Sequence, residues 1–253
     1  MLTRYLPWFI LLALLAEILG TVGGFGSSVY FVPMANFFMD FQSVLGITAL
    51  YHLASNLSKI GFFRKGIDKS LILYMGIPAV VLVSAGAWMS RWIDPESLSM
   101  VLGVFLLVFS LVFLIRRDLK VKPDGKNALI GGALSGFLAG ILGTGGAVRG
   151  AVMTTYNLSK ERFIATSAVI DLAVDVSRTL VYANNGYIHK HDLYLVPFLI
   201  VVSVVGTYIG KKILQRITQQ QFRKFVLFLL LLIGLVTLVY HVPGVLGWIR
   251  VAD

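Results

Sequence analysis

The chain has 253 residues, of which 57% are hydrophobic and only 13% are charged, and its mean hydropathy is +0.84. These values lie outside the averages of soluble globular domains and indicate that apolar side chains face lipid. The chain has no cysteine, which excludes disulfides, thiolate metal sites and cysteine nucleophiles. In such a protein the formal charge of +10 is first a signal of membrane topology, so no nucleic-acid partner is expected.

Apolar segments recur along the whole chain and predict helices that cross or enter the bilayer. In the first half they cover residues 6–22, 27–39, 43–63, 70–90 and 97–115. In the second half they cover residues 127–142, 147–158, 161–183, 192–210 and 219–240. The second segment of each half is short, because an upright helix needs roughly twenty residues to span the hydrocarbon. We expect these two segments to be half-helices that return from a glycine break.

Several markers recur at a constant offset of 119 residues. The matched pairs are Gly26 with Gly145, Thr48 with Ser167, His52 with Asp171, Lys59 with Arg178, and Pro78 with Pro197. Internal duplication is the simplest account, and it divides the chain into a first transmembrane repeat, 1–120, and a second, 121–253. Because five segments per half is an odd number, the second half is expected to enter from the opposite face as an inverted repeat. The alternative, two parallel halves, needs an even number.

The distribution of Lys and Arg between alternate loops predicts the orientation. One set of loops holds fifteen basic residues and covers residues 64–69, 116–126, 160–162 and 211–224. The other set holds four, which are Arg4, Arg91, Lys190 and Arg250. Cytoplasmic loops are enriched in Lys and Arg, so the larger group is predicted to face the cytoplasm. Both termini are then outside, whether the short segments cross or return.

A glycine cluster lies at the break in each half. The first half has Gly20, Gly23, Gly24, Gly26, Ser27 and Ser28, and the second has Gly140, Gly143, Thr144, Gly145 and Gly146. Glycine permits positive φ, so such a cluster can end one helix and begin another with exposed peptide N–H groups. Two half-helix N-termini near the midplane would direct partial positive charge at a bound anion. We expect the substrate here; the alternative is that the glycines only let helices pack closely.

Two further segments each have one polar stripe at helical spacing. In the third segment the stripe consists of Thr48, His52, Asn56 and Lys59. In the eighth it consists of the duplicates Ser167, Asp171, Asp175 and Arg178. A charged side chain at the bilayer centre costs roughly 2.5 to 3.5 kcal/mol, so both stripes are expected to face the interior of the bundle.

The stripes supply four expected substrate contacts, His52, Asn56, Lys59 and Arg178. Asp171 and Asp175 are candidates for proton or cation coupling, and the alternative is structural pairing, as for Asp175 with Arg178 at i,i+3. His52 is either part of a proton relay or a satisfied interior histidine. Lys59 and Arg178 either face the site or extend to the membrane interface.

Arg149 lies three residues past Gly146, where a half-helix begins and a guanidinium could bind an oxyanion bidentately. We expect a substrate contact, with a structural ion pair as the alternative. Glu17, in a leucine-rich span, is expected to pair with one of the buried cations. No phosphate-loop or HExxH pattern is present, and the four histidines show no ligand spacing. We therefore expect no ATP hydrolysis, metal, cofactor or enzyme activity.

The sequence resembles the TauE/SafE family, the group of sulfite exporters and sulfonate uptake permeases, from about Leu11 to Tyr240. The resemblance rests on the duplication, on the Ala165-Thr166-Ser167 run, and on a glycine run that leads to an apolar residue and a proline, here Val32-Pro33. The second half leads instead to Val152-Met153 and lacks the proline. The resemblance implies export or uptake of sulfite, sulfonates or related sulfur-containing anions across the cytoplasmic membrane. Arg149, Asp171 and Asp175 do not match the family pattern.

Together these patterns predict an all-α polytopic membrane protein with two inverted repeats of about five segments each. Eight segments are expected to span fully and two to return as glycine-broken re-entrant half-helices, or all ten to cross. The expected function is secondary transport of a small anion by alternating access, with proton coupling through Asp171, Asp175 or His52. The alternatives are an anion channel and a membrane-embedded enzyme. The sequence leaves the oligomeric state undecided, and a homodimer is one of the alternatives.

Overall fold

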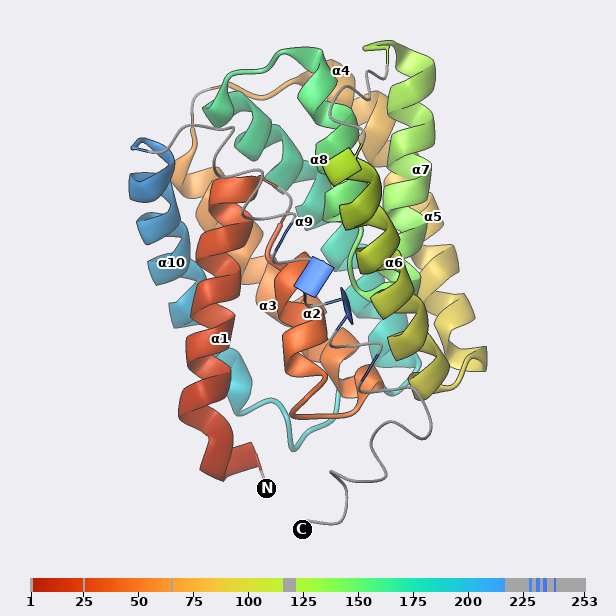
Figure 1. Cartoon of the computed structure of the whole chain (residues 1–253), viewed down its shortest axis with the longest axis vertical. Helices are drawn as coiled ribbons and strands as arrows, with labels where there is room; N and C mark the ends of the chain where they lie inside the picture. The colour runs from red at the N-terminus through yellow and green to blue at the C-terminus, as the bar shows by residue number, and fades with distance from the viewer. Residues whose placement is uncertain are drawn as a thin grey trace.

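The computed structural model describes residues 2–24, 26–64, 66–115 and 122–216, with a few isolated positions between 228 and 239. All regular elements in these residues are helical (Figure 1). The first half contains α1 (Leu2–Gly23), α2 (Ser28–Ala35), α3 (Phe41–Phe62), α4 (Lys69–Leu71), α5 (Ile77–Met89) and α6 (Pro95–Ile115). The second half contains α7 (Gly125–Leu142), α8 (Gly146–Met153), α9 (Lys160–Asn184) and α10 (Leu195–Leu214). The predicted segment 219–240 falls outside the described residues, apart from those isolated positions.

Five of the described helical stretches are long and apolar enough to cross a membrane. They are Tyr5–Gly23, Lys69–Trp92, Pro95–Val112, Gly125–Leu142 and Leu195–Leu214. The second of these joins α4 to α5 through a π-helical stretch, Ile72–Gly76. Large apolar side chains on these helices remain exposed, as Leu73 and Val201 do, which suits contact with lipid.

The helices α3 and α9 do not belong to these five, although they have 22 and 25 residues. Their polar stripes lower the hydropathy, and the structure packs the two helices against each other with most of the stripe side chains buried. Ser43 near the start of α3 contacts His189 just beyond α9, whereas Phe63 beyond α3 packs with Ala165 near the start of α9. The two helices therefore run antiparallel.

Acidic and hydroxyl side chains cap the N-terminal ends of several helices. Asp40 accepts a hydrogen bond from Ser43 N (2.9 Å) at the start of α3, and Asp124 accepts one from Asn127 N (2.8 Å) at the start of α7. Ser159 does the same for α9. These contacts satisfy N–H groups that have no partner within their own helix. Asp40 and Ser159 are 119 residues apart, so the offset found in the sequence also relates two helix starts.

The short helices α2 and α8 have eight residues each, about 12 Å at the usual rise of an α-helix, and cannot span the hydrocarbon. Each folds back along the helix before it. Phe9 of α1 packs edge-on against Phe31 of α2, with ring centroids 5.6 Å apart. In the second half Gly131 of α7 lies beside Val152 of α8. The predicted short segments thus form two helical hairpins, α1–α2 and α7–α8.

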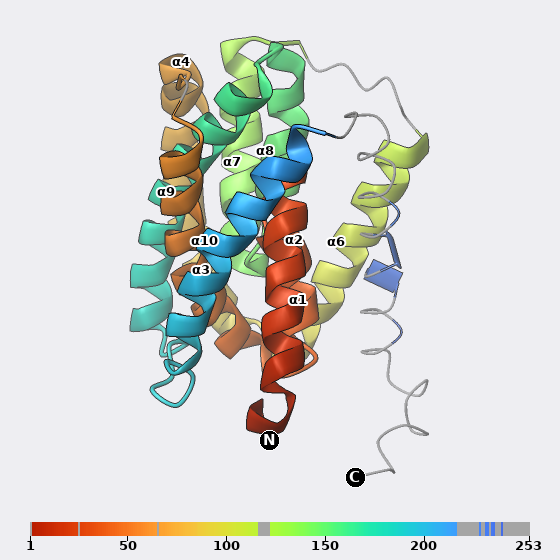
Figure 2. The ribbon, with the colours of Figure 1, turned by 90° about the vertical axis from the view of Figure 1, so that its left-hand side faces the viewer.

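Glycines bring helices of the two halves close together. A Cβ at Gly136 or Gly140 of α7 would overlap backbone carbonyl oxygens of α5, and one at Gly132 would overlap the Met75 carbonyl oxygen of the π-helical stretch before α5. On the other side of the bundle α10 packs along α1, where Gly206 lies against the side chain of Glu17 (Figure 2). Each hairpin helix is thus paired with a long helix from the other half of the chain, α7 with α5 and α1 with α10.

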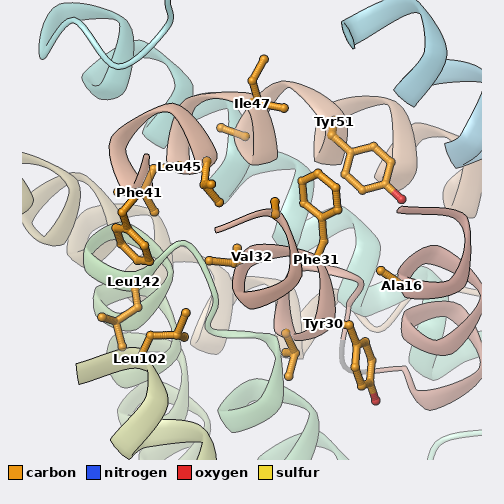
Figure 3. Packing of buried hydrophobic residues seen from close by; sticks show 14 of the residues in the cluster. Ala16, Tyr30, Phe31, Val32, Phe41, Leu45, Ile47, Tyr51, Leu102 and Leu142 are labelled. Atoms are coloured by element: carbon orange, nitrogen blue, oxygen red, sulfur yellow. The ribbon is translucent and has the colours of Figure 1, made fainter. Parts of the chain in front are cut away.

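The hydrophobic core surrounds α2, as expected for a short helix that lies inside a bundle. Phe31 and Val32 of α2 face Leu45 and Tyr51 of α3, and Leu142 at the end of α7 closes the cluster (Figure 3). The Tyr51 hydroxyl donates to the Ala13 carbonyl of α1 at 3.1 Å. This packing fixes the position of the break between α1 and α2, which borders the candidate site.

Candidate transport site

The breaks between α1 and α2 and between α7 and α8 are built on glycines in left-handed backbone conformations. Gly24 has φ +69°, Gly26 has φ +82° and Gly143 has φ +74°. L-residues with a side chain rarely adopt such angles, so the turns need glycine at these positions. Gly24 and Gly143 differ by the duplication offset, and the two breaks meet where Ser28 Oγ lies 3.3 Å from Thr144 Oγ1.

Arg178 of α9 is fully buried and bonds in two directions. Its Nη2 lies 2.7 Å from Asp175 Oδ1, and its Nη1 donates to the Gly143 carbonyl at 2.7 Å. The C-terminal end of α7 has partial negative charge, which favours a guanidinium. The i,i+3 pair expected from the sequence is therefore present, and Arg178 does not extend to the membrane interface. Its Nε has no hydrogen-bond partner among the described residues.

Asp175 joins the two polar stripes. The Asn56 amide nitrogen donates to Asp175 Oδ2 at 2.6 Å, and His52 Nδ1 lies 3.7 Å from the same oxygen. Ser27 Oγ donates to Glu17 Oε2 at 2.7 Å and lies 3.0 Å from His52 Nε2. Because Ser27 has only one hydroxyl proton, His52 Nε2 is the donor in that contact. His52 thus connects the stripe carboxylate to the α1–α2 break.

Glu17 is the centre of a second buried pair. Its carboxylate lies 2.9 Å from Lys59 Nζ and accepts hydrogen bonds from Ser55 and Thr207, each at 2.9 Å, as well as from Ser27. These groups come from α1, α3, α10 and the α1–α2 break, so one carboxylate ties four elements together. Lys59 is buried and turned inward, which contradicts the interface alternative for this residue. From the sequence, Glu17 is predicted only to pair with an unspecified buried cation. The feature that points to this role is an acidic residue within a leucine-rich segment.

Arg149 lies in the first turn of α8 and is 1% exposed. Its Nη2 forms an ion pair with Asp171 Oδ2, and its Nε donates to Ser167 Oγ at 3.1 Å. Both partners belong to the α9 stripe. The structural alternative for Arg149 is therefore present in this conformation, and a substrate oxyanion would have to replace the Asp171 carboxylate on the guanidinium.

A small cavity, with room for about one water molecule, lies between the α1–α2 break and the two stripes. It is lined by Gly20, Gly24, Gly26, Asn56, Lys59, Ile164, Ser167, Ala168 and Asp171. A Cβ on Gly26 would point into this space, with Asp171 Oδ2 3.9 Å away. Asp171, whose side chain is 14% exposed, is the stripe carboxylate that reaches the cavity.

The other predicted site residues are not among those that line this cavity. They are Gly23, Ser27, His52, Gly143, Thr144, Gly145, Gly146, Arg149, Asp175 and Arg178. Gly145 has a clear packing role, because a Cβ there would overlap the Ser135 carbonyl oxygen of α7. For this glycine the close-packing alternative explains the residue type.

No ligand spacing is expected among the histidines from the sequence, and whether any of them binds a metal stays a prediction. The structure brings His189, His191 and Asp192 together in the loop after α9, with possible ligand atoms within 4.8 Å of one another. His189, His191 and Asp192 lie close together in the sequence, and this short spacing is the feature that could have predicted the cluster. These residues belong to the loop that follows α9 and are not among those that line the cavity.

Comparison with known proteins places the whole bundle in one group. The family described as Sulfite exporter TauE/SafE matches residues 9–237. A probable membrane transporter protein of Methanocaldococcus jannaschii is 24% identical over 242 residues, which cover 86% of this chain and 90% of that protein. The probable membrane transporter protein YunE of Bacillus subtilis is 25% identical over 247 residues, which cover 81% of this chain and 89% of that protein.

Proposed function

Because the chain belongs to the TauE/SafE family, a family of multi-pass membrane transporters and not of enzymes, we propose that it moves a small sulfur-containing anion such as sulfite or a sulfonate. The observation that carries this proposal is the set of three buried cations, Lys59, Arg149 and Arg178, of which Lys59 lines the cavity and Arg149 pairs with the cavity residue Asp171. Cations buried at membrane depth are costly unless they serve a pairing partner or a substrate. Guanidinium groups suit the oxygens of sulfite and sulfonates, which they can bind bidentately.

Charge balance supports coupling to protons. Each of the three cations faces a carboxylate: Lys59 with Glu17, Arg149 with Asp171, and Arg178 with Asp175. With all six groups ionised, this interior has no net charge to offer an anion. Protonation of one carboxylate releases one positive charge, so a proton and a monovalent anion can enter together without leaving a buried net charge. This balance favours symport of the anion with a proton.

The geometry around His52 supports a place for that proton. Since His52 Nε2 donates to Ser27, its Nδ1 faces Asp175 Oδ2 at 3.7 Å. His52 Nδ1 is then an unprotonated acceptor, so a proton carried by Asp175 would have an acceptor facing it across this gap. Asp171, which reaches the cavity and holds Arg149, is the second candidate for coupling. We propose that the proton passes between these carboxylates and the cavity during transport.

We further propose that the halves 1–120 and 121–253 are inverted repeats that rock against each other in alternating access. The constant offset, the two hairpins, and the antiparallel pairing of α3 with α9 support this arrangement. In this proposal α2 and α8 are re-entrant half-helices. The excess of basic residues in the loops that include Arg64, Lys126 and Lys212 supports a cytoplasmic position for that end, with both termini outside the cytoplasmic membrane.

Uptake measurements in proteoliposomes test the proposal. Radiolabelled sulfite and taurine should accumulate when a proton gradient is imposed along the direction of transport, and an uncoupler should abolish the accumulation. Arg149→Gln should lower the initial rate at least about tenfold, the effect of losing a charge-assisted contact of about 1.5 kcal/mol or more. Arg162→Gln, which changes an exposed arginine paired with Asp68, serves as the control and should keep the rate.

Three outcomes would contradict the proposal. Retention of transport and of its pH dependence in both Asp171→Asn and Asp175→Asn would remove the coupling role. Currents far above transporter turnover in a planar bilayer would favour a channel instead. If neither sulfite nor any sulfonate is moved or raises the melting temperature of the purified protein, the substrate class is wrong.

A further inference from the structure

The loop between α9 and α10, residues 185–194, brings two histidines and an aspartate together at the end of the molecule where the N-terminus lies (Figure 1). His191 Nε2 lies 3.4 Å from Asp192 Oδ1, and His189 Nδ1 lies 3.6 Å from Asp192 Oδ2. The two imidazole rings are nearly parallel, at 13°, with centroids 5.2 Å apart. Three potential ligand groups thus converge without help from the transport site.

Asp192 has an oxygen that the protein leaves unused. Asp192 is 6% exposed, and its Oδ2 forms no hydrogen bond in the part of the chain that the structure describes. A buried carboxylate oxygen without a donor is costly, and each such group in a folded protein calls for an explanation. His189 Nδ1 lies 3.6 Å from Oδ2, too far for a hydrogen bond, and contacts Ser43 Oγ at 2.8 Å instead.

We propose that His189, His191 and Asp192 bind a divalent transition-metal ion of the Zn²⁺ type. Two imidazoles and a carboxylate are a ligand set that Zn²⁺ accepts, whereas Mg²⁺ and Ca²⁺ prefer oxygen ligands. Ligand atoms around a tetrahedral zinc lie about 3.3 Å apart, given metal–ligand bonds of about 2.0 Å. The distances of 3.4 and 3.6 Å run to different oxygens of Asp192, and one ligand atom from each of the three residues lies within 4.8 Å of the others. Side-chain rotation would therefore be needed to bring the three ligand atoms around one ion.

The surroundings explain what the ion would do. Ser43 belongs to the first turn of α3, and its hydroxyl contacts His189 Nδ1. His189 can therefore bind the ion through Nε2 while Ser43 orients the ring, or through Nδ1 once the contact with Ser43 opens. Gly46 of α3 packs directly on the Tyr187 carbonyl of the loop. A bound ion would hold the loop in the conformation that rests on α3, so it stabilises the closure between the first and second halves at this end of the bundle.

Metal titration of the purified full-length chain, with its affinity tag removed and adventitious metal stripped by chelator, tests the site. Calorimetry should give one Zn²⁺ per chain and no heat with Mg²⁺, and the melting temperature should rise with Zn²⁺ concentration. His191→Gln is the sharpest variant, because that side chain is 77% exposed and its replacement leaves the fold intact. It should weaken Zn²⁺ binding by at least about tenfold, since even the loss of a group outside the ligand set costs that much.

Asp192→Asn should have the same effect, and Glu96→Gln, which alters an exposed acid outside the cluster, should have none. X-ray absorption of the zinc-loaded protein should show imidazole ligands, and this readout holds even if Asp192→Asn folds poorly. Zinc binding that is unchanged in His191→Gln, or absent from the wild type, would overturn the proposal. Because binding is measured without transport, its failure leaves the proposed function untouched.

Discussion

Asn56 and Asp175 occupy duplicate positions, 119 residues apart, and their side chains are joined directly by a hydrogen bond of 2.6 Å. Two residues related by a twofold rotation touch each other only near the rotation axis. The contact therefore marks where the axis of the proposed repeats would pass, between α3 and α9. On one side of this contact Lys59 pairs with Glu17, and on the other Arg178 pairs with Asp175 and the end of α7.

The burial of Arg178 predicts a large loss of stability when its charge is removed. Arg178→Gln leaves Asp175 in the interior without its ionic partner, and breaking a buried pair in this way costs about 3 to 5 kcal/mol. Arg162→Gln breaks an exposed pair and should cost less than about 1 kcal/mol. Thermal unfolding of both variants in the same detergent measures the difference. Equal melting temperatures would show that Arg178 is not a buried structural cation.

Glu17 and Lys59 should behave as one unit. Glu17→Gln strands the Lys59 ammonium and Lys59→Met strands the Glu17 carboxylate, so each single change should destabilise the protein by about 3 to 5 kcal/mol. The double variant leaves neither charge unpaired and should be more stable than either single variant. A double-mutant cycle from denaturation gives the coupling energy, which should be at least about 1 kcal/mol. Additive effects would contradict the pairing.

Gly145 should tolerate no side chain. In Gly145→Ala the new methyl group overlaps the Ser135 carbonyl oxygen, so the α7–α8 hairpin must open, at a cost of about 1 to 3 kcal/mol or more. Gly61→Ala is the matched control, because a Cβ at this helical position meets nothing within 4 Å. The control should gain up to about 1 kcal/mol from helix propensity. Melting temperatures that fall for Gly61→Ala and not for Gly145→Ala would refute the packing assigned to the hairpin.

The absence of cysteine makes the orientation directly measurable. Lys190→Cys should react with a membrane-impermeant maleimide added to intact cells, because the α9–α10 loop is predicted to lie outside. Lys126→Cys, at the start of α7, should react only after the membrane is opened. The reverse pattern of labelling would invert the predicted topology without changing the fold.

Much of the architecture could be predicted from local sequence. The glycine runs predict the positions of both helix breaks correctly, since Gly24, Gly26 and Gly143 adopt positive φ there. The prediction that the stripes on α3 and α9 face the interior is correct, because charged groups facing lipid cost too much free energy to be tolerated. The segment lengths correctly singled out α2 and α8 as too short to span. The last predicted segment, 219–240, lies almost wholly outside the described residues and stays a prediction.

The sequence by itself determined the helices, their polar faces and the positions of the breaks, because these depend on hydropathy and backbone freedom within a few residues. Only the tertiary structure decided the partners. Glu17 meets Lys59, and Arg149 meets Asp171, because glycines such as Gly145 and Gly206 set how closely the helices approach and how they are rotated. Which side chains then come within bonding distance depends on that approach over the whole bundle, and no local pattern in the chain encodes it.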